Sequence, residues 1–157
     1  MKSKLTLLIA FLFLTSTPTI AQNEQDLQTL SIFSELVKSK NYSAAYTPWM
    51  ELRTRNPKFN KAIFVYGERI LDHKIDNSQG DEKINFINDM LKLWQERKAV
   101  FPNITPSGTY MAKACQLEYD HREILNKSNE VLYAAFDKAY TTDPKTFTNP
   151  KSLYTYF

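Results

Sequence analysis

The sequence has little glycine and almost no cysteine. Of its 157 residues three are glycine and one, Cys115, is cysteine. So few glycines exclude collagen-like and low-complexity chains and leave little room for glycine-rich phosphate-binding loops. One cysteine excludes an internal disulfide framework and a multi-cysteine zinc site. Apolar residues make up 43% of the chain and aromatic residues 13%, enough to bury the core of a single domain.

The first 21 residues have the pattern of a secretory signal peptide. Lys2 and Lys4 precede an apolar run over residues 5–14, and Ala21 is a small residue at the expected cleavage site. The run is about ten residues long, whereas a membrane span needs about 20. We therefore expect residues 1–21 to be removed and residues 22–157 to form an exported domain, in the periplasm or on the cell surface.

The charge of the exported domain is nearly balanced. Loss of the two signal lysines leaves 18 basic and 17 acidic residues, a net charge of +1. A near-neutral surface argues against nucleic acid or an anionic membrane as the main partner. We expect no membrane insertion after the signal is removed.

Helical periodicity dominates residues 22–157. Apolar residues recur three and four positions apart, and no segment alternates with a period of two. The pattern predicts six main helices and the start of a seventh, near residues 27–37, 43–55, 59–74, 82–101, 106–119, 129–142 and from 150 onward. Asp26, Ser43 and Ser128 are the predicted caps of the first, second and sixth helices.

The same arrangement recurs where three of these helices end. A proline lies eight residues after an aromatic residue, which itself lies four residues after an apolar one. The three sets are Ala45, Trp49 and Pro57; Met90, Trp94 and Pro102; and Leu132, Phe136 and Pro144. The prolines are 45 and 42 residues apart. A local pattern at a nearly fixed period predicts a stacked array of helical hairpins.

These residues resemble the second-helix pattern of the tetratricopeptide repeat family. That pattern adds a small residue three positions after the aromatic one, where this chain has Leu52, Arg97 and Ala139. Ile63, Tyr66 and Gly67 resemble the first-helix pattern, although the period exceeds the 34 residues of the family. The resemblance implies an all-α superhelix of about three repeats plus an unpaired C-terminal helix.

The chain as a whole also resembles secreted repeat proteins of the Bacteroidetes. The resemblance rests on the segments Asn60–Leu71 and Thr146–Phe157. Those proteins tend to be longer, and the apolar stripe of Leu153, Tyr154 and Phe157 begins a helix without a following partner. We therefore expect these residues to be the N-terminal part of a longer product, or their last helix to dock on a partner.

Residues that could carry chemistry are few. His73 and His121 are not spaced as a helical metal-ligand pair, and the sequence predicts no metal or cofactor site. Glu68 and Asp72 lie four apart on one helix face, a spacing that suits acid–base work but is more typical of a surface pair. We therefore expect no catalytic residues and no enzyme.

Tyrosine is the unusual residue, with nine copies. Most fill the core in our interpretation, while Tyr66, Tyr110 and Tyr119, on first helices, are candidates for partner contact. The resemblance implies a scaffold or adaptor that binds another protein or peptide. The alternative is a periplasmic or surface module that binds peptide or glycan through the groove tyrosines.

Overall fold

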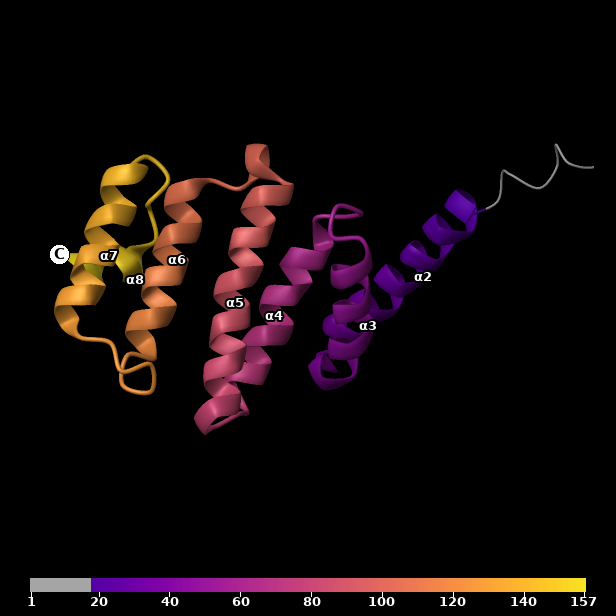
Figure 1. The fold of residues 1–157 in the computed structure, drawn as a ribbon, viewed down its shortest axis with the longest axis horizontal. Coiled ribbons are helices and arrows are strands. Elements are labelled where there is room, and N and C mark those ends of the chain that lie inside the picture. The colour runs from indigo at the N-terminus through magenta and orange to yellow at the C-terminus, as the bar shows by residue number, and fades with distance from the viewer. Residues whose placement is uncertain (1–17) are drawn as a thin grey trace, which may run out of the picture.

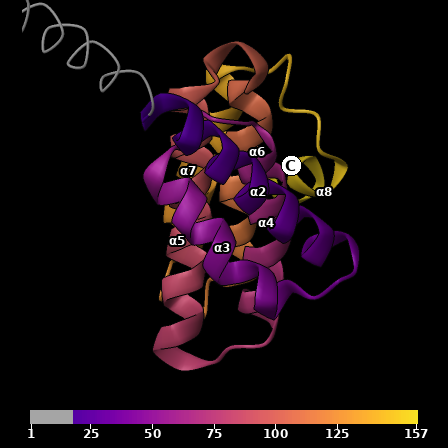
Figure 2. The same ribbon diagram turned by 90° about the vertical axis from the view of Figure 1, so that its right-hand side faces the viewer.

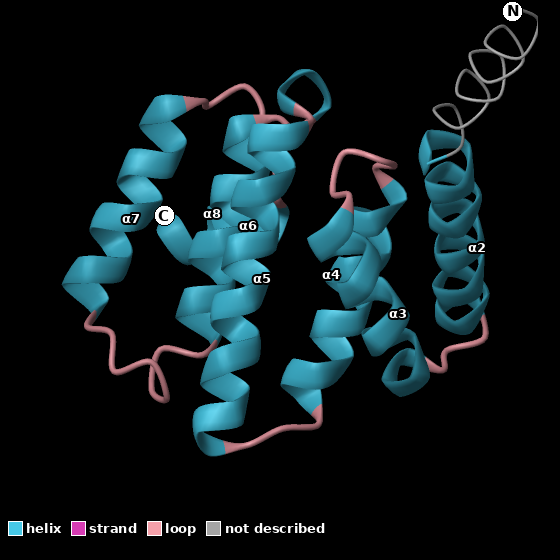
Figure 3. Cartoon of the chain, turned by 45° about the vertical axis from the view of Figure 1, so that its right-hand side comes forward, coloured by secondary structure: helices cyan, strands magenta, loops and turns pink. Residues whose placement is uncertain are grey.

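The computed structural model describes residues 18–157, and this part of the chain contains helices and loops but no strand (Figure 3). The helices are α2 (Pro18–Lys38), α3 (Tyr42–Arg55), α4 (Ala62–Asp76), α5 (Gly80–Val100), the short 3-10 helix η1 (Pro102–Ile104), α6 (Ser107–Asp120), α7 (Asn129–Thr142) and α8 (Pro150–Tyr156). The predicted signal peptide, residues 1–21, lies mostly outside the described residues. The predicted all-α class is confirmed.

The helices pack in neighbouring pairs that follow one another along the molecule. The hairpins are α2–α3, α4–α5 and α6–α7, arranged from one end of the long axis to the other (Figure 1). Seen along that axis, the pairs overlie one another (Figure 2). Helix α8 packs against α6 and α7 as a single additional helix. The predicted array of three hairpins plus an unpaired last helix is therefore confirmed.

The second helices of the three hairpins end in the same way. Each of α3, α5 and α7 ends six residues after its aromatic residue and two residues before its proline. The residue before each proline is driven out of the helical region by the proline ring. Asn56 (φ −149°, ψ 72°), Phe101 (φ −127°, ψ 59°) and Asp143 (φ −153°, ψ 74°) have nearly the same backbone conformation. The pattern in the sequence therefore has one local structural cause.

The apolar and aromatic residues of that pattern point into the core. The buried ones are Ala45, Trp49, Leu52, Met90, Trp94, Leu132, Phe136 and Ala139. The prolines lie nearer the surface, with Pro57 half-buried and Pro102 and Pro144 exposed. Burial of a large apolar side chain contributes about 1.5–3 kcal/mol, so these positions stabilise the packing of the hairpins.

Two of the predicted helix caps are wrong. Asp26 lies within α2, where it is fully buried and accepts hydrogen bonds from Arg55 (2.9 Å) and Asn56 (2.8 Å) at the end of α3. Asn41, not Ser43, caps α3 by accepting from the Ala44 amide. The predicted cap of α7 is correct, since the Ser128 hydroxyl accepts from the Val131 amide.

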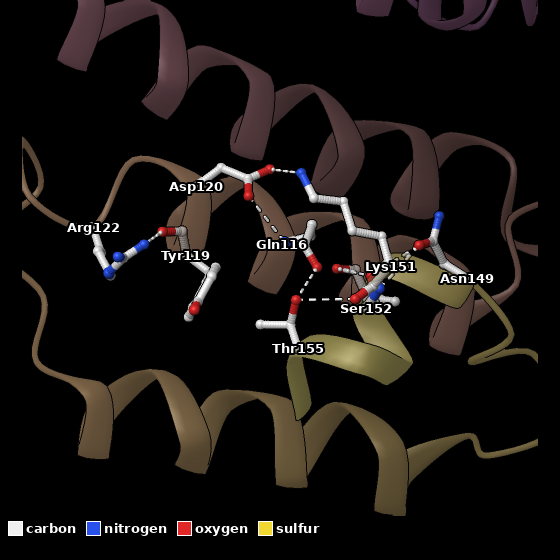
Figure 4. Close-up of polar contacts among 9 residues, drawn as sticks. Gln116, Tyr119, Asp120, Arg122, Asn149, Lys151, Ser152 and Thr155 are labelled. Carbon is white, nitrogen blue, oxygen red and sulfur yellow. Dashed lines mark hydrogen bonds and ion pairs between the residues drawn. The ribbon is translucent and has the colours of Figure 1, made fainter. Parts of the chain in front are cut away.

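The last helix is joined to α6 by polar contacts. Figure 4 shows Lys151 paired with Asp120 (2.6 Å) and the Thr155 hydroxyl donating to the Gln116 side-chain oxygen (3.1 Å). The buried Ser152 donates to the Ala112 carbonyl oxygen (3.3 Å). Aromatic packing with α7 adds to this, and the Tyr156 hydroxyl donates to Asp137 (2.8 Å). These contacts fix α8 although it has only seven residues.

Candidate functional site

The candidate site is an apolar groove between α5 and α6. It has a volume of about 410 Å³. We call it the α5–α6 groove and define it by its lining residues: Leu91, Trp94, Gln95, Lys98, Ser107, Tyr110, Met111, Ala114 and Glu118. The volume is within the range of pockets that bind small molecules or peptide side chains.

The groove lies where the second hairpin meets the third, which we call the second junction. The buried apolar residues form two separate clusters, one from Phe33 in α2 to Trp94 in α5 and another in α6, α7 and the segment around Phe147. The first cluster spans the first junction, where α2–α3 meets α4–α5. At the second junction this cluster is continued into α6 by the partly buried Tyr110, Ala114 and Leu117.

Trp49 closes the first junction. Its indole N–H donates to the carbonyl oxygen of Ile63 (2.7 Å), and its ring lies against Gly67 of α4. A Cβ atom at residue 67 would lie 2.6 Å from Cζ2 of Trp49, closer than side chains tolerate. Glycine at this position therefore allows the two hairpins to approach.

Trp94 holds the equivalent position at the second junction with different contacts. It lines the groove, and its buried indole N–H has no hydrogen-bond partner in the described part of the chain. An unpaired buried donor costs about 1–3 kcal/mol. The two tryptophans thus have the same place in the repeat, but Trp49 packs against Gly67 of the next hairpin whereas Trp94 lines a groove.

The three candidate tyrosines do not share one surface. Tyr110 lines the groove. Tyr66 packs edge-on against Phe33 (ring centroids 6.2 Å apart), and Tyr119 packs edge-on against Phe136 (6.5 Å). The structure therefore brings only Tyr110 to the groove and uses the other two partly in packing between helices.

Tyr110 lies among charged groups contributed by three helices. The Arg97 guanidinium and the Lys113 ammonium are each 5.1 Å from its ring centroid. Lys113 also forms an ion pair with Glu68 of α4 (2.6 Å). Burial and then the negative charge of Glu68 raise the pKa of Tyr110, with Arg97 opposing them. The phenol is therefore neutral at physiological pH and can donate a hydrogen bond at the groove.

The paired carboxylates Glu68 and Asp72 lie in different surroundings on α4. Glu68 forms an ion pair with Lys113, and Asp72 is exposed on the surface of α4. Partial desolvation, then repulsion by Glu68 and Asp76, raises the pKa of Asp72. Neither carboxylate lines the α5–α6 groove.

Cys115 and His121 both have pKa values shifted by burial. Burial is the main cause that raises the pKa of Cys115 to about 11, so its thiol is protonated and unreactive. Burial and the charge of Lys83 lower the pKa of His121. Within residues 18–157, no three His, Cys, Asp or Glu side chains gather as metal ligands.

Much of the groove cannot be recognised from single residues of the sequence. The repeat pattern identifies Trp94 and the tyrosines include Tyr110, but Leu91, Lys98 and Ser107 carry no signal as separate residues. The usable signal is the repeat itself, because it places Lys98 at the position that Arg53 occupies one repeat earlier.

No helix of residues 18–157 is both long enough and apolar enough to cross a membrane. Comparison with protein-family models, curated proteins and solved structures found no match to this chain.

Proposed function

We propose that this protein is an exported, non-enzymatic scaffold or adaptor that binds another protein or peptide through an array of tetratricopeptide-like repeats. The observation that carries the proposal is the apolar α5–α6 groove, which has a volume of about 410 Å³ and is lined by Trp94, Tyr110 and Met111 among others. Aromatic residues and methionine are enriched where proteins bind one another. The signal-peptide pattern supports export to the periplasm or cell surface.

A pull-down from the cell envelope tests this proposal. The tagged protein is compared with Tyr110→Ala, which alters the groove, and with Tyr66→Ala, which alters a tyrosine outside it. We expect a reproducible protein partner that is lost with Tyr110→Ala and retained with Tyr66→Ala. Far-UV circular dichroism of both variants controls for folding. A partner retained by both folded variants, or no partner above background, contradicts the groove-binding scaffold.

The alternative is a module that binds peptide or glycan through groove tyrosines. The observation in its favour is that Tyr110 lines the groove and can present both a ring face and a hydroxyl donor. Titration with oligosaccharides, followed by tryptophan fluorescence, separates the two functions because Trp94 lies in the groove. Saturable quenching by a sugar, absent in Trp94→Phe, favours the glycan-binding module.

A further inference from the structure

The first junction shows how this fold neutralises a cation between two second helices. Arg53 of α3 is 5% exposed and binds two carboxylates of α5, Asp89 (2.9 Å) and Glu96 (2.8 Å). Its guanidinium also lies 5.1 Å from the centroid of the Trp49 ring. Asp89 and Glu96 are seven residues apart, so they lie on one face of α5, about 10 Å apart along its axis.

The second junction has a cation at the position equivalent to Arg53 but no carboxylates at the positions equivalent to Asp89 and Glu96. Lys98 follows Trp94 by four residues, as Arg53 follows Trp49. In the register set by the aromatic residues, the positions of Asp89 and Glu96 are occupied in α7 by Val131 and Lys138, both exposed. Within residues 18–157, no carboxylate lies within ion-pair distance of Lys98, and its ammonium donates to the Thr105 carbonyl oxygen (3.0 Å).

The acidic groups near the groove are already engaged. Glu118, at the end of the groove away from Lys98, is paired with Lys127 (2.6 Å). The hydrogen bond from Thr146 is the main cause that lowers the pKa of Asp143, followed by the Gly108 amide and, more weakly, the charge of Lys98. The charge of Lys98 therefore acts on Asp143 without an ion pair, while the Asp143 carboxylate accepts hydrogen bonds from the Thr146 hydroxyl (2.6 Å) and the Gly108 amide (3.1 Å). Lys98 therefore supplies a positive charge at one end of the groove without an ion pair to any carboxylate of residues 18–157.

We propose that the α5–α6 groove binds an acidic amphipathic helix of a partner protein. This inference rests on the proposed scaffold function and names the chemistry of the partner. The groove runs along α6 from Ser107 to Glu118, about 16 Å at 1.5 Å per residue, which matches three turns of helix. The partner's apolar face covers Leu91, Trp94 and Met111, and its carboxylates reach Lys98 as Asp89 and Glu96 reach Arg53.

A peptide taken from this chain can test the charge requirement. The probe is a fluorescent peptide of residues 80–100, which carries Asp89 and Glu96, and the control is the same peptide with D89N and E96Q. Fluorescence anisotropy measures their binding to the purified protein and to its Lys98→Glu, Ala114→Phe and Arg53→Met variants. Ala114→Phe fills the groove, and Arg53→Met alters the first junction instead.

We expect saturable binding of the parent peptide and about fivefold weaker binding of the D89N/E96Q peptide, because loss of an ion pair costs about 1 kcal/mol. Lys98→Glu should weaken binding of the parent peptide by at least as much, and Ala114→Phe should abolish binding of both peptides. Arg53→Met should bind normally. Equal binding of the two peptides, normal binding by a folded Lys98→Glu, or no binding would overturn the acidic-helix proposal.

The two proposals fail separately. If the pull-down recovers a partner that depends on Tyr110 while neither peptide binds, the scaffold function stands and the acidic-helix inference fails. If the parent peptide binds more tightly than the D89N/E96Q peptide but no cell-envelope partner is found, the chemistry of the groove stands and the scaffold function as proposed fails.

Discussion

The contact between Gly67 and Trp49 gives the sharpest test of how the hairpins are joined. In Gly67→Ala the new methyl group would lie 2.6 Å from Cζ2 and 2.8 Å from both Cε2 and Nε1 of the buried Trp49 ring. Overpacking of this kind costs about 1–3 kcal/mol. Displacing the ring also weakens its hydrogen bond to Ile63, which costs about 1 kcal/mol. Alanine has a higher helix propensity than glycine, which stabilises the variant by about 1 kcal/mol. We therefore predict that Gly67→Ala lowers the free energy of unfolding by about 2 kcal/mol.

A double-mutant cycle isolates the cause of that loss. Trp49→Leu removes all three ring atoms that the new methyl group would meet. In that background Gly67→Ala should stabilise the protein by about 1 kcal/mol through helix propensity alone. The two substitutions should therefore be coupled by about 3 kcal/mol. Urea unfolding followed by far-UV circular dichroism measures each free energy of unfolding without depending on tryptophan emission.

Gly80 provides the matched control. It has a positive φ of 55°, and no neighbouring atom lies within 4 Å of the position that a Cβ atom would take. Gly80→Ala should therefore cost about 1 kcal/mol through backbone strain alone. That cost should be the same in the wild type and in the Trp49→Leu background. A Gly67→Ala variant that is as stable as the wild type, or that loses the same free energy in both backgrounds, would refute the packing argument.

Other contacts give three further predictions. Arg53→Met should lower the free energy of unfolding by about 2 kcal/mol, because it leaves two partly buried carboxylates, Asp89 and Glu96, without their cation. Lys98→Met, at the equivalent position of the next repeat, should change the free energy of unfolding by less than about 0.5 kcal/mol. Urea unfolding compares the two variants. Burial alone would raise the pKa of Asp26, but hydrogen bonds from Asn56 and Arg55 outweigh it and lower that pKa. The contribution of Asp26 to the free energy of unfolding is therefore present above the unfolded-state pKa of about 3.9 and is lost as pH falls through the folded-state pKa. Unfolding of wild type and Asp26→Asn from pH 6 to pH 2 should show the smaller acid-induced loss in the variant. A thiol reagent at pH 8 should modify the native protein, whose only cysteine is buried and has a pKa of about 11, far more slowly than the unfolded protein.

The sequence was informative where one residue fixes local geometry. Each proline restricts the residue before it, so the ends of α3, α5 and α7 could be predicted from Pro57, Pro102 and Pro144. The burial of the aromatic residues followed from the same register. Arg97 fitted that pattern poorly because it is charged, yet it is buried with its guanidinium over the ring of Tyr110.

Contacts between distant side chains could not be read in the same way. Asp26 had the sequence position of a helix cap, but a buried carboxylate can equally bind the end of another helix, as it does with Arg55. Trp49 and Trp94 were indistinguishable by pattern. Their difference depends on what faces each ring, Gly67 with the Ile63 carbonyl at one junction and an open groove at the other.

Photo-crosslinking in cells tests the central claim, that a protein binds in the α5–α6 groove, most directly. A benzophenone amino acid replaces Gln95, an exposed groove residue, and in the control replaces Gln28, exposed on α2. If a protein occupies the groove, we expect a specific protein adduct at position 95 that is absent at position 28 and disappears with Ala114→Phe. No adduct at position 95, or the same adduct at both positions, would contradict it.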